Sequence, residues 1–75
     1  MRKEDVLAIK YLYMIARSRT KGSSYARETV VLNREVASLA KERGVPYQKM
    51  WKMIVNRAYE ILLELLAERF KDVKL

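Results

Sequence analysis

Hydrophobic residues recur at the spacing of an α-helix through most of this chain. Helix-favouring residues follow one another without a break over about residues 3–20, which predicts a first helix. Its apolar positions leave only a narrow polar line, so this helix is expected to be covered on more than one side. The polar line runs through Lys3, Lys10, Arg17 and Lys21.

A break is expected between this helix and the next apolar segment. Gly22 opens the only cluster of small residues and is placed as a helix C-cap. The run from Thr29 to Leu32, in which three of the four residues are β-branched, then predicts a loop that ends in an extended segment. Because Asn33 is a good N-cap and Gly44 a good terminator, a second helix is expected over about residues 34–43.

A long third helix is expected at the C-terminal end. Pro46 suits its first turn, and no breaker interrupts the segment from Tyr47 to about Lys71. Such a helix is roughly 37 Å long, more than the roughly 29 Å width of a compact chain of this size. Its apolar end is therefore expected to fold along the first helix or to pair with another subunit. The residues expected at a dimer interface are Ile61, Leu62, Leu65, Leu66 and Phe70.

These patterns predict an all-α fold, a three-helix domain with a long C-terminal helix. A chain of 75 residues allows a single domain, here residues 1–75. Small domains often need a disulfide, a metal or a partner subunit, and this chain has no cysteine and no histidine. A partner subunit is the remaining way to stabilise it, and a homodimer is expected.

The residue types present argue against catalysis. Without cysteine or histidine, zinc sites, thiol nucleophiles and imidazole general bases are excluded. Glu60, Glu64 and Glu68 form a row on one helix face, but no second acidic motif accompanies them. We expect no enzyme, no metal site and no cofactor. This row needs cations opposite, which the polar line of the first helix could supply from the same or a partner subunit.

Charge and hydropathy narrow the class of partner. Sixteen basic against nine acidic residues give a net charge of +7, which favours polyanions such as nucleic acid. No apolar run is long enough for a signal peptide or a membrane span, so a cytoplasmic protein without a membrane partner is expected. Scarce amides and abundant charged residues suggest a thermophilic source.

The stretch from Glu35 to Ile54, EVASLAKERGVPYQKMWKMI, resembles the helix-turn-helix of transcriptional regulators. Ala40 is the small residue where the two helices would cross, and Gly44 is the turn residue that tolerates positive φ. The short segment before it also resembles the first strand of winged members, although no wing can follow. The apolar residues expected to hold the second helix of the motif are Val45, Met50 and Met53.

The resemblance implies that the start of the third helix enters the DNA major groove. Gln48 is then the candidate for an adenine contact and the lysines for phosphate contacts. The motif departs from the family at Pro46, where a Ser or Thr cap is usual, and at Trp51, which continues a stripe with core spacing and is expected to pack. The candidate contact residues are Tyr47, Gln48, Lys49, Lys52 and Asn56.

Lysines at the start of a helix oppose its dipole, which suits a surface that meets phosphate. An alternative is that Lys49 and Lys52 pair with carboxylates of the second helix, such as Glu35 or Glu42. Arg17 and Lys21 are further nucleic-acid candidates, but cations near a helix C-terminus also need no ligand.

The leading functional hypothesis is a dimeric helix-turn-helix protein that binds double-stranded DNA as a transcriptional regulator or genome-organising factor. One alternative is a small basic RNA-binding accessory protein of a ribonucleoprotein such as the ribosome. Another is a helical protein-interaction or virion structural module whose helices form an oligomer interface.

Overall fold

The computed structural model describes residues 1–21 and 26–73, with side chains for 1–18 and 27–73. Within these residues the chain forms three α-helices and no strand, which confirms the all-α prediction. The expected cap at Gly22 and the small residues after it lie outside the described residues. The helices are α1 (Lys3–Lys21), α2 (Ala26–Arg43) and α3 (Tyr47–Arg69).

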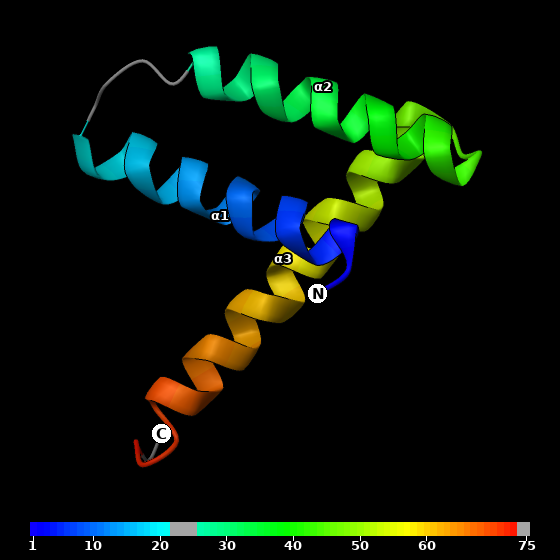
Figure 1. Ribbon diagram of the computed structural model, residues 1–75. Helices are drawn as coiled ribbons and strands as arrows, with labels where there is room; N and C mark the ends of the chain where they lie inside the picture. The colour runs from blue at the N-terminus through cyan, green and yellow to red at the C-terminus, as the bar shows by residue number, and fades with distance from the viewer. Residues whose placement is uncertain (22–25, 74–75) are drawn as a thin grey trace.

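The helices form a hairpin crossed by a third helix (Figure 1). α1 and α2 lie side by side and antiparallel, and α3 begins at the end of the hairpin where α2 stops. α3 crosses the start of α1, and its C-terminal half extends away from the other two helices. The molecule measures 44 × 29 × 19 Å, with a radius of gyration of 14.1 Å. A compact domain of this length has a radius of gyration near 11 Å, so the chain is elongated.

The hydrophobic core lies where the three helices meet. Its largest fully buried side chains are Met50, Ile54 and Val36, contributed by α3 and α2. Ala8 of α1 and Ala58 of α3 are buried small residues, which allow the two helices to approach closely. The remaining buried apolar residues are Leu7, Leu32, Leu39 and Ala40.

The second helix is longer than its sequence pattern predicts. α2 begins at Ala26, so the segment from Thr29 to Leu32 is helical and the expected extended segment is wrong. Asn33 lies inside this helix rather than at its N-cap. The helical penalty of β-branched residues is at most about 0.7 kcal/mol each, whereas burying one Leu contributes about 1.5–3 kcal/mol. Burial of Leu32 beside Val36 therefore outweighs local propensity.

A row of three ion pairs joins α1 to α2 at seven-residue intervals, and we call it the ion-pair ladder. Each step of seven residues forward along α1 is matched by seven backward along α2, which fixes the antiparallel register. The basic residues lie roughly 140–180° around α1 from Ala8, so the ladder runs along the outside of the hairpin. The pairs are Lys3–Glu42 at 2.8 Å, Lys10–Glu35 at 2.8 Å and Arg17–Glu28 at 3.6 Å.

The acidic row of α3 is paired with cations of α3 and of the segment directly after it. Arg57 reaches Glu60 at 2.9 Å and Glu64 at 3.9 Å. Lys71 lies 3.4 Å from Glu68. Within the subunit, Lys3, Lys10 and Arg17 of the basic line of α1 pair with α2 instead.

The end of α3 does not fold back along α1. Ile61 is half-buried against the core, so this member of the expected dimer interface packs inside its own subunit. Beyond it the apolar side chains face outward, with Leu63 65% and Leu65 60% exposed. We call the exposed apolar residues of this half of α3 the tail face. They are Leu62, Leu63, Leu65, Leu66 and Phe70.

Candidate nucleic-acid interface

A tight turn joins α2 to α3. Gly44 has a φ of +68°, in the left-handed region where a Cβ is strained. Its N–H donates to the Lys41 carbonyl at 3.2 Å, and the Val45 N–H donates to the Ala40 carbonyl at 3.0 Å. This pair of bonds is the Schellman arrangement, which satisfies the last carbonyls of α2. The predicted turn residue therefore stands where the backbone requires glycine.

Pro46 starts α3 without a side-chain cap. Its φ of −62° and ψ of 146° are extended, and no side chain bonds the free N–H groups of the first turn. The carbonyl of Pro46 accepts from the Met50 N–H at 3.0 Å, so the first helical bond is made. The first turn carries no acidic residue, which leaves the positive end of the helix dipole uncompensated by side chains of α3.

The residues of α3 that face the core differ by one position from those that the sequence predicts. Met50 is fully buried and Val45 is half-buried, as the motif predicts. Met53, however, is 40% exposed, and Ile54 is the residue fully buried against the hairpin. Met50, Ile54 and Ala58 recur at four-residue spacing on one face, and Met53 falls outside that stripe.

Trp51 belongs to the packing between α3 and α1. Its ring lies edge-on to that of Tyr11, with centroids 5.8 Å apart and an interplanar angle of 65°. Trp51 is partly buried against the core, as its place in the apolar stripe predicts. It is therefore a structural anchor for α3 and leaves the contact surface to its neighbours.

Four of the predicted contact residues share the outer face of α3, and we call this set the polar face. All four side chains are exposed, and a helical pitch of 3.6 residues places them within roughly 100° of one another. Tyr47 is also exposed but turns toward α2, where its hydroxyl donates to the Asn33 side-chain oxygen at 3.2 Å. The polar face consists of Gln48, Lys49, Lys52 and Asn56.

The lysines of the polar face have no carboxylate partner among the described residues. Glu35 and Glu42, the carboxylates that could have neutralised them, are held by Lys10 and Lys3 in the ion-pair ladder. The alternative that α2 pairs with Lys49 or Lys52 is therefore wrong. Two positive charges at the dipole-disfavoured end of a helix are left to solvent or to an external anion.

α2 adds basic residues that sequence reasoning did not single out. Arg34 and Lys41 are exposed, and neither has an ion pair among the described residues. Arg34 follows Asn33, whose side-chain oxygen accepts from the Tyr47 hydroxyl at the start of α3. Their seven-residue spacing, which places both on one side of a helix, was the available signal.

The two remaining candidates are not part of this surface. Arg17 pairs with Glu28 near the start of α2, at the end of the hairpin remote from the α2–α3 turn (Figure 1). There it lines an apolar groove of about 500 Å³ between α1 and α2, with Ile9 and Val31. The side chain of Lys21 lies outside the described residues.

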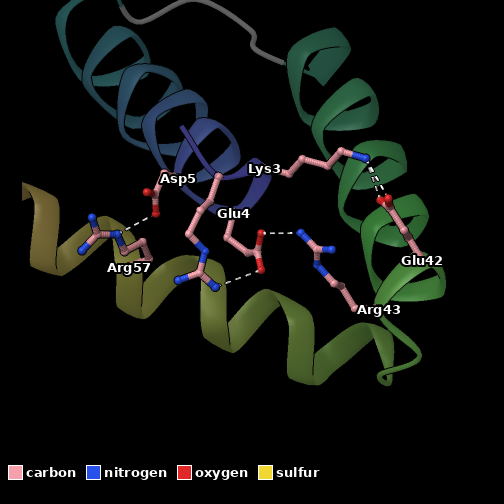
Figure 2. A network of polar contacts seen from close by, with 7 residues as sticks. Lys3, Glu4, Asp5, Glu42, Arg43 and Arg57 are labelled. Carbon is pink, nitrogen blue, oxygen red and sulfur yellow. Dashed lines mark hydrogen bonds and ion pairs between the residues drawn. The ribbon is translucent and has the colours of Figure 1, made fainter.

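Three consecutive charged residues at the start of α1 hold the hairpin and α3 together (Figure 2). Lys3 bonds Glu42 of α2, as part of the ladder. Glu4 accepts from Arg43, the last residue of α2, at 3.1 Å. Asp5 accepts from Arg57 of α3 at 2.7 Å. These three contacts, which we call the clamp, tie the start of α1 to the end of α2 and to α3.

Glu4 is the buried member of the clamp. Its side chain is only 10% exposed and lies between Arg43 and Arg2, the latter at 3.5 Å. The hydrogen bond from Arg43 lowers the pKa of Glu4, and its own backbone N–H acts in the same direction. The carboxylate therefore stays ionised where it ties α1 to the end of α2. In the sequence Glu4 is recognisable only as an acid in the first turn of a helix, where the dipole favours it.

The described residues contain no cluster of acidic side chains that could hold a metal ion. None of their helices is long and apolar enough to cross a membrane. Comparisons with protein-family models, with curated proteins and with solved structures give no match.

Proposed function

We propose that this protein binds double-stranded DNA through the polar face of α3, with the α2–turn–α3 unit acting as a helix-turn-helix. The single observation that carries the proposal is the pair of exposed, unneutralised lysines, Lys49 and Lys52. The carboxylates of α2 that were expected as alternative partners, Glu35 and Glu42, are engaged by α1 instead. A net charge of +7 supports the same class of partner.

The polar face has the residue types that duplex recognition uses. Lysines contact phosphates, and the side-chain amides of Gln48 and Asn56 offer the donor and acceptor pair that reads adenine in the major groove. A helix seated by buried side chains behind it holds such groups rigidly. Met50 and Ile54 supply that support from the core.

The biological role that follows is that of a transcriptional regulator or genome-organising factor acting in the cytoplasm as a homodimer. A single α3 offers few contacts, and doubling the site by symmetry is the usual way for small helix-turn-helix proteins to gain affinity. The exposed tail face supports one further candidate, a protein-interaction module, because it is an apolar surface with no cover in the subunit.

The test is a titration of the protein onto a labelled mixed-sequence DNA duplex and onto a structured RNA, followed by anisotropy at several salt concentrations. The proposal predicts tighter binding to the duplex, with affinity falling steeply as salt rises because counterions are released. Preference for the RNA would replace it with the ribonucleoprotein hypothesis. Absence of binding to both would leave the protein-interaction module.

A further inference from the structure

A single subunit exposes more surface than a compact monomer of its size. Its accessible surface is 6190 Å². A compact monomeric protein of 8.9 kDa exposes about 4,800 Å², so the excess is about 1,400 Å². A standard protein interface removes about 800 Å² from each partner. The excess is therefore large enough to be covered by a second chain of ordinary interface size.

The tail face is one continuous part of the exposed apolar surface. Its five side chains lie on the solvent side of the C-terminal half of α3, opposite Ile61 and the acidic row. The acidic residues of that row are paired with Arg57 of the same helix and with Lys71, just beyond its end. The tail face is thus a mainly apolar surface with Arg69 of the last turn among its apolar residues, and it suits contact with another apolar helix.

We propose that a second copy of this chain covers the tail face, with the two α3 helices antiparallel. A self-complementary surface on one helix forms a closed two-fold interface. Parallel pairing would bring the N-terminal halves of both α3 helices together and face Lys49 and Lys52 with their own counterparts. Antiparallel pairing separates these like charges and leaves both polar faces open.

This arrangement sets the distance between the two polar faces. The tail face is centred near residue 65 and the polar face near residue 51, so each polar face lies about 21 Å from the two-fold axis. The two are then about 40 Å apart, near the 34–36 Å that separates half-sites one turn apart on B-DNA. Around the axis of α3, the centre of the polar face is rotated by about 60° from the centre of the tail face. The two-fold axis then turns both polar faces toward the same side of the dimer. The spacing argument rests on the proposed function, but the pairing does not.

The experiment uses the free protein without DNA, so its failure is separate from failure of the DNA proposal. Sedimentation equilibrium of the wild-type chain is expected to give a dimer, and Leu62→Gln with Leu66→Gln a monomer of unchanged helical circular dichroism. The matched control, Glu60→Gln with Glu64→Gln, changes the opposite face and is expected to remain dimeric. A monomeric wild type, or a dimer that survives the leucine changes, overturns the proposal.

The direction of pairing is tested by distance. Because the sequence has no cysteine, Lys52→Cys supplies a single attachment point for a spin label. Antiparallel helices predict a label separation of about 40 Å by pulsed electron resonance. A separation below about 20 Å, the value expected when the two α3 helices lie parallel and in register, overturns the antiparallel arrangement.

Discussion

Two rows of basic side chains run along this protein, and they differ in whether carboxylates neutralise them. Lys3, Lys10 and Arg17 of α1 each face a glutamate of α2 in the ion-pair ladder. Lys49 and Lys52 of α3 face solvent, without an ion pair among the described residues. Exposed ion pairs contribute at most about 1 kcal/mol each, so the ladder mainly selects the hairpin register.

The comparison shows why net charge alone is a poor guide to a binding surface. The α1 row has more basic residues, but its charges are already balanced locally. The α3 row is smaller, but its two charges are not balanced by carboxylates. Glu35 and Glu42 are engaged in the ladder and form no ion pair with Lys49 or Lys52. One set of interactions thus defines both a structural surface and a free basic one.

The largest expected effect comes from unseating α3. Ile54→Ala removes a fully buried side chain and is expected to lower the free energy of unfolding by about 2–5 kcal/mol. Met53→Ala, one residue away on the 40% exposed side, is the matched control and is expected to change it by less than about 1 kcal/mol. Urea denaturation followed by circular dichroism measures both. Equal losses would show that the inner and outer faces of α3 are assigned incorrectly.

The next largest effect on stability is expected at the clamp, in the contact between Glu4 and Arg43. Glu4→Gln is expected to lower the free energy of unfolding by about 1–3 kcal/mol at neutral pH, because it replaces a buried carboxylate held by Arg43. The folded-state pKa of Glu4 is lowered, so its stabilisation is present above the unfolded-state pKa and is lost as the pH falls through the folded-state value.

The window for this loss lies below about pH 4.3, the ordinary pKa of a glutamate. Denaturation midpoints measured between neutral pH and pH 2 should therefore converge for the wild type and Glu4→Gln at the acid end. Glu60→Gln, which changes an exposed carboxylate, serves as the control and is expected to follow the wild type. A constant difference between wild type and Glu4→Gln at every pH would contradict the role given to the ionised form.

The smallest expected effect tests whether a free positive charge far from α3 contributes to DNA binding. Glu35→Gln frees Lys10 in the ladder and is expected to cost less than about 1 kcal/mol of stability. Lys10 points away from the core side of α1, so the released charge is not expected to reach DNA bound at α3. The salt dependence of duplex binding should stay unchanged. A steeper dependence would show that any free cation on this surface contributes.

The extent of α1 and α3 could be predicted within about two residues, because each begins after a charged or proline residue and runs without a breaker. The start of α2 could not be predicted, since the mostly β-branched run from Thr29 to Leu32 locally favours an extended segment. Only the tertiary burial of Leu32 decides it. Local propensity differs by tenths of a kcal/mol per residue, which packing readily exceeds.

The residues of the candidate site could be predicted from the sequence, but not which of its charges are neutralised by ion pairs. Helical spacing places Gln48, Lys49 and Lys52 on one surface, and the structure has all three exposed. Which lysines are neutralised depends on the antiparallel register of α1 and α2, which no local pattern encodes. The choice between Met53 and Ile54 as the buried residue likewise depends on how α3 is rotated against the hairpin.

The most direct test compares the two basic rows in one measurement, the slope of duplex affinity against salt concentration. Two double variants remove the same charge from different rows. They are Lys49→Gln with Lys52→Gln in α3, and Lys3→Gln with Lys10→Gln in α1. The account predicts that the first pair reduces the slope by about 2, one for each lost phosphate contact, and that the second leaves it unchanged. Equal reductions, or a reduction only in the second pair, would contradict binding through α3.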